Sequence, residues 1–186
     1  HVSLVGSEMC IRDRSNIVVQ KFGGTSLADT DRFKAVAKII KDTSKKGKKV
    51  VAVVSAMAGE TQRLIDLAKK VQETPDPREY DALISSGEQV SVALLAMTLR
   101  NEKVKSKSYT AFQLGLRTDD YHGKARINSI DTKNILKDIS ADITPVITGF
   151  QGVNEEGDIT TLGRGGSDTS AVALAVALEA EECQIY

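Results

Sequence analysis

A lysine followed by two glycines and two hydroxyl residues is the part of this sequence best suited to hold a phosphate. Residues 17–19 begin an apolar run typical of a short buried strand, and Lys21-Phe22-Gly23-Gly24-Thr25-Ser26 lies at its end. Lys21 would place an ammonium group beside backbone amides that a ligand can approach closely, because glycine has no Cβ. A surface lysine beside an ordinary turn is the alternative, but a plain strand end has no need of a glycine pair.

Two further segments combine glycines with small hydroxyl residues, at 55–61 and at 163–170. In an open α/β sheet such junctions meet in one crevice, where the amino-terminal ends of helices present unpaired N–H groups to an anion. Taken singly, each segment could be an ordinary turn with Thr61 or Ser167 as the helix N-cap and Asp168 in the first helical turn. Three such junctions in one chain favour a shared phosphate-binding crevice.

The residues available for catalysis exclude several common mechanisms. Neither Gly-x-x-x-x-Gly-Lys-Ser/Thr nor Gly-x-Gly-x-x-Gly occurs, so the chain lacks the fingerprints of a Walker-type NTPase and of a dinucleotide-binding Rossmann domain. Histidine occurs only at His1 and His122, which excludes a histidine-rich metal site and would leave a Ser-His-Asp mechanism dependent on His122. The chemistry must come from lysine, arginine, carboxylates and backbone amides.

Apolar periodicity predicts alternating strands and helices, which favour a parallel α/β sheet. We expect helices around 33–40, 64–71, 78–100, 135–139 and 171–180, and strands around 17–19, 50–54, 145–150 and 183–186. Residues 103–130 indicate short strands with a hairpin-like excursion, and 154–158 a hairpin tip. In the 78–100 helix we expect a weak point at Gly87 and a core stripe of Val90, Ala93, Leu94 and Met97. The last helix is apolar nearly all round, which predicts that it is buried.

The composition indicates one packed domain without affinity for polyanions. The chain has 186 residues, 41% of them hydrophobic, and its 25 Lys and Arg balance its 25 Asp and Glu, which removes the long-range attraction of a general nucleic-acid binder. Cys10 and Cys183 suit neither a disulfide framework nor a zinc site. No stretch approaches the roughly 18 apolar residues of a membrane span. We therefore expect a cytoplasmic protein without nucleic-acid or membrane partners.

The two ends of the chain suggest a gene fragment. Residues 1–15 have no initiating Met and no clear period, so they indicate a foreign or disordered leader, and the fold is assigned to 16–186. A strand that begins near residue 183 and stops at Tyr186 suggests a domain that is incomplete at its carboxyl end.

Four segments together resemble the aspartate kinase family. They are Lys21–Ser26, Ser55-Ala56-Met57-Ala58-Gly59-Glu60-Thr61, Ser86-Gly87-Glu88-Gln89 and Gly163-Arg164-Gly165-Gly166-Ser167-Asp168, in the family's order and across nearly everything after Ser15. The resemblance implies the amino-acid-kinase fold, a three-layer α/β/α sandwich with a mainly parallel sheet, here without its regulatory domains.

The reaction implied by this resemblance is transfer of the ATP γ-phosphoryl group to the side-chain carboxylate of L-aspartate. It gives 4-phospho-L-aspartate, the first step toward lysine, threonine and methionine, with ATP and Mg²⁺ as cofactors and a homo-oligomer as the full-length parent. Because an aspartate side chain has a pKa of about 3.9, the nucleophile is already ionised and needs no general base. Catalysis then depends on positioning and charge neutralisation.

The family also implies a role for each matched residue on the phosphate side. Lys21 would bridge phosphate oxygens, the amides of Gly23 and Gly24 would hold the transferred group, and Thr25 and Ser26 would line the same loop. Asp168 would orient Lys21 or organise Mg²⁺, although no residue is assigned as a metal ligand.

On the substrate side, the resemblance implies that Glu88 pairs with the amino-acid ammonium and that Arg164 grips the α-carboxylate. Ser55, Thr61 and Ser167 would add hydroxyl contacts. Taken without their motifs, Glu88 and Arg164 would more often be solvated surface charges, and the matched motifs favour the functional interpretation.

Two departures from the family pattern and three alternatives remain. Ala111 stands where the family has glycine, and the chain ends before the family's nucleotide-contacting segment and regulatory domains, so we expect weak or absent turnover from these residues alone. The nearest alternative is a sister kinase acting on glutamate or N-acetylglutamate. Another is a non-catalytic ligand-binding module of the same fold, and a nucleic-acid binder is a poor third.

Overall fold

A five-stranded parallel sheet forms the centre of the computed structural model, which describes residues 16–186. The expected leader, with His1 and Cys10, lies outside these residues. The strand order is β3-β6-β2-β1-β9, and every neighbouring pair is parallel. The strands are β1 (Ile17–Phe22), β2 (Lys49–Val54), β3 (Ser106–Tyr109), β6 (Thr144–Thr148) and β9 (Glu182–Ile185). The parallel sheet predicted from the alternation is confirmed.

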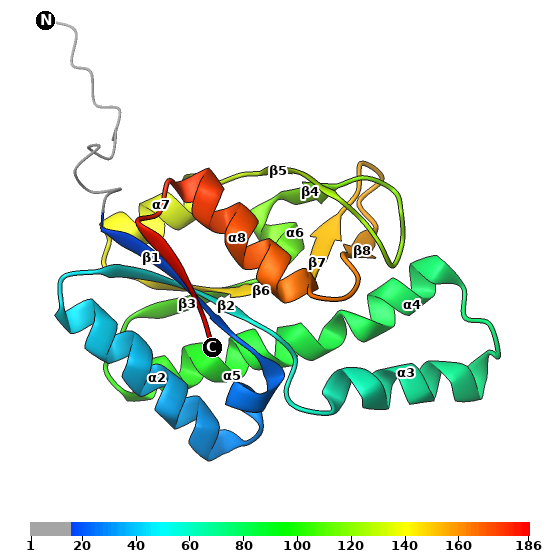
Figure 1. The fold of residues 1–186 in the computed structure, drawn as a ribbon, viewed down its shortest axis with the longest axis horizontal. Coiled ribbons are helices and arrows are strands. Elements are labelled where there is room, and N and C mark those ends of the chain that lie inside the picture. Colours follow the sequence, from blue (N-terminus) through cyan, green and yellow to red (C-terminus); the bar gives the residue numbers. More distant parts are fainter. Residues whose placement is uncertain (1–15) are drawn as a thin grey trace, which may run out of the picture.

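Helices cover both faces of this sheet and make three layers (Figure 1). On one face lie α2 (Thr30–Lys45) and α5 (Ser86–Asn101), and on the other lie α6 (Ala111–Leu114), α7 (Lys133–Ser140) and α8 (Gly166–Leu178). Successive residues of a strand point to opposite faces. Val50, Ala52 and Val54 therefore pack with α2 and α5, while Val51 and Val53 pack with α8. This is why the β2 sequence is a continuous apolar run.

A second, four-stranded sheet lies beside the first, in the order β5-β4-β7-β8. It consists of β4 (Leu116–Thr118), β5 (Ile127–Ile130), β7 (Gln151–Val153) and β8 (Ile159–Thr161). The β4–β5 and β7–β8 pairs are antiparallel hairpins, as expected for 103–130 and for the tip at 154–158. The remaining elements are η1 (Gly24–Leu27), α3 (Glu60–Val71) and α4 (Pro77–Ile84), and Figure 1 shows α3 and α4 projecting to one side.

The long helix predicted over 78–100 is interrupted at Ser85 rather than at Gly87, and its core stripe was predicted wrongly. Val90 and Met97 are 47% and 58% exposed. The buried face instead comprises Gly87, Glu88, Ser91, Val92, Leu95, Ala96 and Leu99. Alpha-helix α5 is apolar on more than one face, so periodicity could not identify the inner one.

Helices α4 and α5 together correct the expectation that no stretch is long and apolar enough to span a membrane. The run Pro77–Asn101 contains an 18-residue window with a mean hydropathy of 1.4, which is enough by length and composition to cross a membrane. Half of that window is buried inside the fold. Packing against the sheet and α2 accounts for the buried apolar residues of α5, such as Val92, Leu95 and Leu99.

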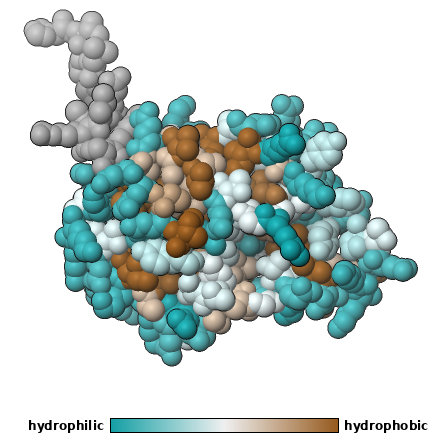
Figure 2. Space-filling model, in the orientation of Figure 1, coloured by the Kyte–Doolittle hydropathy of each residue, from teal (hydrophilic) through white to brown (hydrophobic). Residues whose placement is uncertain are grey.

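Helix α8 is less buried than its composition predicted. Leu174 and Leu178 are buried, whereas Val172 and Val176 are 52% and 73% exposed. Figure 2 shows apolar side chains on this face of the molecule. Only the stripe that meets the sheet is covered, and an all-apolar sequence cannot indicate which stripe that is.

The alanine that departs from the family pattern sits without strain. Ala111 is the first residue of α6, which begins with a capping box formed by Thr110 and Gln113, and it is not among the residues with positive φ. The turn therefore needs no glycine at this position.

Candidate active site

A cavity of about 850 Å³ lies where β1 and β2 end and where α3, α5 and α8 begin. Most of the residues singled out from the sequence line it: Lys21, Gly24, Thr25, Ser55, Thr61, Glu88, Arg164, Ser167 and Asp168. Gly23 and Ser26 are not among the lining residues. The three glycine-rich junctions therefore meet in one crevice at the carboxyl edge of the parallel sheet, as the sequence predicted.

Lys21 and Asp168 come together at the base of this cavity although they are far apart in the sequence. Lys21 lies in β1 and Asp168 in the first turn of α8, and their Nζ and Oδ1 atoms are 2.8 Å apart. The Lys21 side chain is only 12% exposed, whereas that of Asp168 is 53% exposed. A buried strand thus carries the cation, and the open side of the pair faces solvent where an anion can approach.

The two glycines of the turn after β1 have different surroundings. The Gly23 amide donates a 3.0 Å hydrogen bond to the Tyr186 carbonyl, and the rings of Phe22 and Tyr186 stack with centroids 5.0 Å apart. This amide is therefore hydrogen-bonded at the β1–β9 edge of the sheet in this structure. Gly24 does line the cavity, and a Cβ there would lie 3.1 Å from the Ala56 carbonyl oxygen, so its lack of a side chain permits a close approach of two backbones.

Glycines, rather than hydroxyl residues, occupy the N-cap positions of α3 and α8, two of the three helices that begin at the cavity. Gly59 precedes α3 and Gly165 precedes α8, with φ of 77° and 69°, and neither N-cap has a side-chain hydrogen bond. The alternative in which Thr61 or Ser167 is the helix N-cap is thus wrong. Because no cap side chain covers the first-turn N–H groups, both helix ends suit an anion.

Glu88 is the most unusual group in the cavity. It lies in the first turn of α5 and is 2% exposed, and its Oε1 accepts a 3.2 Å hydrogen bond from the Ala56 N–H. Its Oε2 is buried without a hydrogen-bond partner. Burial raises the pKa of Glu88 from 4.5 to about 7, against the lowering effect of backbone hydrogen bonds. Such a carboxylate is suited to receive a cation from a ligand.

Arg164 lies on the loop between β8 and α8 and is exposed. Among residues 16–186 its guanidinium makes no hydrogen bond or ion pair, so its five N–H donors remain free for an anion. Ser167 follows in the first turn of α8, and a Cβ added to Gly149 would come within 2.7 Å of its Oγ. Gly149 therefore allows the end of β6 to approach the start of α8 closely.

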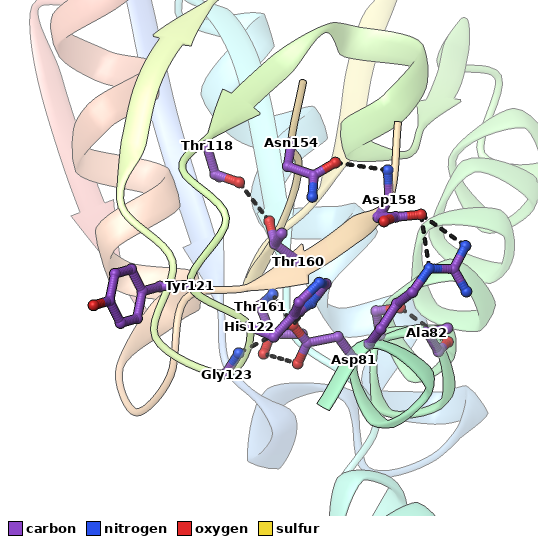
Figure 3. A network of polar contacts seen from close by, with 12 residues as sticks. Asp81, Ala82, Thr118, Tyr121, His122, Gly123, Asn154, Asp158, Thr160 and Thr161 are labelled. Atoms are coloured by element: carbon purple, nitrogen blue, oxygen red, sulfur yellow. Dashed lines mark hydrogen bonds and ion pairs between the residues drawn. The ribbon is translucent and has the colours of Figure 1, made fainter. Parts of the chain in front are cut away.

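Sequence reasoning missed a buried network beside the cavity. Asp81 accepts hydrogen bonds from His122, Gly123 and Thr161, and Figure 3 shows these residues converging from a helix, a loop and a strand. Gly123 and Thr161 line the cavity, together with Tyr80 and Phe150, which were also not predicted. No local motif marks these residues, because their partners are about 40 and 80 positions away in the sequence.

Within residues 16–186 no group of three or more His, Cys, Asp or Glu side chains could hold a metal ion. Glu88 and Asp168 are the carboxylates that line the cavity. A protein cage for a metal is therefore lacking in the described part of the chain.

The sequence from residue 16 to residue 186 matches the amino acid kinase family. The chain belongs to this family. An aspartate kinase of Stutzerimonas stutzeri strain A1501 is 56% identical over 170 residues, which cover 91% of this chain and 41% of that protein. The chain thus spans about 41% of the length of that curated relative.

Solved structures of amino acid kinases share the fold. The crystal structure of an aspartate kinase from Synechocystis matches with a TM-score of 0.78 and 45% identity, over 91% of this chain and 28% of that one. Aspartokinase III of E. coli, in complex with aspartate and ADP, matches with a TM-score of 0.81 and 27% identity, over 91% of this chain and 48% of that one. These neighbours confirm the predicted amino-acid-kinase fold with its mainly parallel sheet.

Proposed function

We propose that this chain forms the substrate and phosphoryl side of an aspartate kinase, which transfers the γ-phosphoryl group of ATP to the side-chain carboxylate of L-aspartate. One observation carries the proposal: a lysine–aspartate pair and a buried carboxylate with an unpartnered oxygen line the same cavity as a free arginine. The identity to aspartate kinases supports the same substrate.

Lys21 and the uncapped helix ends serve the phosphoryl group in this proposal. The Lys21 ammonium, held at 2.8 Å by Asp168, neutralises charge that moves toward the leaving ADP. The N–H groups at the start of α3 and α8 add a positive potential in the same cavity. No general base is required, because the aspartate carboxylate is ionised at neutral pH.

Glu88 and Arg164 serve the amino acid. The unpartnered Glu88 oxygen receives the α-ammonium, and the Arg164 guanidinium binds the α-carboxylate through parallel hydrogen bonds. An N-acetylated amine carries no charge for Glu88 to pair with, so this arrangement disfavours N-acetylglutamate. Ser55, Thr61 and Ser167 line the same space and are available as further hydroxyl contacts.

Mg²⁺ fits this site only as a companion of the nucleotide. It usually binds through one or two carboxylates and substrate phosphates and keeps several waters, and Asp168 is a half-exposed carboxylate beside the proposed phosphate site. Asp168 would hold the ion, which when bound lowers the negative charge of the phosphates. Gly24, Thr25 and Lys21 would contact the phosphate oxygens directly.

The activity, the cytoplasmic location and a homo-oligomeric assembly are proposed for the longer protein of which this sequence is a part. The test uses the complete reading frame that carries it, with ADP release measured for aspartate, glutamate and N-acetylglutamate. Aspartate-dependent ADP release, with an acyl phosphate trapped by hydroxylamine, is expected. Calorimetric binding of aspartate without any hydroxamate would instead support a ligand-binding module, and preference for glutamate would support a sister kinase.

A further inference from the structure

A single buried carboxylate joins three segments that border the candidate active site. Asp81 lies in α4 and is 0% exposed. Its Oδ2 accepts hydrogen bonds from His122 Nδ1 (2.8 Å) and from the N–H groups of Gly123 (3.0 Å) and Thr161 (3.0 Å), and its Oδ1 accepts one from Thr161 Oγ1 (2.7 Å). Figure 3 shows the donors gathered around this one carboxylate. All four contacts link α4 to distant parts of the chain.

The segments that Asp81 holds lead to the proposed arginine. Thr161 ends β8, and its backbone N–H and hydroxyl bind Asp81 while its carbonyl accepts a 2.9 Å hydrogen bond from Ala125. Gly163, two residues later, lies so close to the 120–125 loop that a Cβ would be 3.0 Å from the Gly123 carbonyl oxygen. The start of the loop that carries Arg164 is therefore fixed through Asp81.

The helix that carries Asp81 leads to the proposed glutamate. Only Ser85 separates α4 from α5, and Glu88 is seven residues beyond Asp81 along this helical run. Asp81 thus connects the helical run that carries Glu88 in the first turn of α5 to the loop that carries Arg164. These two groups must be correctly spaced to bind the ammonium and carboxylate of one amino acid.

We propose that Asp81 is a positioning residue that sets the spacing between Glu88 and Arg164 and thereby the affinity for the amino-acid substrate. This inference rests on the proposed function of the cavity. Asp81 itself is 0% exposed and does not line the cavity, so it would not touch the substrate. It acts through the two groups that would, whereas Lys21 on the nucleotide side pairs with Asp168 and makes no hydrogen bond to Asp81.

The chain offers a matched control on the same helix. Arg78 pairs with Asp158 at 2.7 Å and so links α4 to the β7–β8 hairpin, as Asp81 does. The Arg78 side chain is 55% exposed and neither partner lines the cavity. Arg78→Gln therefore removes a link between the same elements without disturbing the substrate side.

The test compares Asp81→Asn and Arg78→Gln in the complete protein. An asparagine at 81 can keep its oxygen at the three N–H donors and turn its NH₂ group toward the Thr161 hydroxyl, but it lacks the negative charge that those donors share. The three charge-assisted hydrogen bonds are therefore weakened. We expect the KM for aspartate to rise about tenfold or more, with the KM for ATP and kcat each within about threefold of wild type. Arg78→Gln should leave all three close to wild type. His122→Ala, which leaves three of the four hydrogen bonds, should give a smaller rise.

Hydrogen–deuterium exchange supplies a readout that does not depend on turnover. Exchange at 161–166 should accelerate in Asp81→Asn and not in Arg78→Gln. If the wild type is active but Asp81→Asn keeps its aspartate KM, or raises both KM values equally, the positioning role is overturned. A wild-type protein without aspartate-dependent ADP release would refute the proposed function instead. In that case, unchanged exchange at 161–166 in Asp81→Asn would also refute the inference that Asp81 fixes this segment. If Asp81→Asn does not fold, His122→Ala carries the same comparison, and an unchanged aspartate KM there overturns the proposal.

Discussion

Glu88 should destabilise the ligand-free protein at neutral pH, because its charged carboxylate is buried and one of its oxygens has no hydrogen-bond partner. The side chain is 2% exposed, one of its oxygens has no partner, and its pKa is raised from 4.5 to about 7 by burial. Below about pH 4.5 the carboxyl is protonated in both the folded and the unfolded chain. Between about pH 4.5 and 7 the unfolded chain loses its proton first, so stability falls, and above 7 the loss is complete.

The size of this effect follows from the pKa difference. A rise from 4.5 to about 7 corresponds to roughly 3 kcal/mol of lost stability at about 1.4 kcal/mol per tenfold change. Glu88→Gln removes the charge, but its NH₂ group takes the place of the unpartnered oxygen. This buried NH₂ group without a partner lowers the stability of the variant by about 1–2 kcal/mol. The variant should therefore be more stable than wild type by about 1–2 kcal/mol above pH 7.

The assay is thermal unfolding of the complete protein without ligand, at about pH 5 and about pH 8. The gain of Glu88→Gln should be largest at the higher pH, whereas Glu155→Gln, an exposed residue of the hairpin tip, should change nothing at either pH. With aspartate added, the wild type should be stabilised and Glu88→Gln should not. A gain that is equal at both pH values would refute the buried, unpaired charge, and full aspartate stabilisation of the variant would refute its role.

Three further substitutions test the other parts of the cavity. Lys21→Ala should lower kcat by about 10²–10³ with little change in the aspartate KM, because the Lys21 charge acts mainly in the transition state. The measurement is steady-state kinetics, and an unchanged kcat would show that Lys21 has no catalytic role. Arg164→Ala should raise the aspartate KM by about tenfold to a hundredfold. Arg164→Lys should not restore it, because an ammonium lacks the planar pair of donors. Wild-type affinity for aspartate in calorimetry, for either variant, would contradict this role. Gly149→Ala should lower stability by about 1–3 kcal/mol in urea unfolding, because its Cβ would lie 2.7–2.9 Å from Ser167 atoms, and wild-type stability would show that α8 moves freely.

The sequence was sufficient wherever a local pattern determines the structure. The run at 50–54 is apolar on both faces because β2 is covered by helices on both sides, and this could be predicted from composition alone. The lysine and glycine motif at 21–26 and the glycine-rich junctions at 55–61 and 163–168 indicated a shared crevice, because parallel strands end at one edge of a sheet. Lys21 and Asp168 were paired by resemblance, and their atoms lie 2.8 Å apart.

Local patterns were insufficient where packing selects among equivalent choices. Helix α5 carries apolar residues on several faces, so only its contacts with the sheet decide that Leu95 is buried and Met97 exposed. The N-caps of α3 and α8 are Gly59 and Gly165, both with positive φ, although Thr61 and Ser167 are the better capping residues in sequence terms.

The sequence by itself determined the chemical groups, the order of the strands and helices, and the edge of the sheet at which those groups gather, since each depends on residues close together in the chain. Tertiary structure alone decided that the Gly23 amide is occupied by Tyr186, that one oxygen of Glu88 has no partner, and that Asp81 receives donors from about 40 and 80 residues away. Burial and hydrogen-bond saturation depend on what the rest of the chain places around a group, and no local pattern records that.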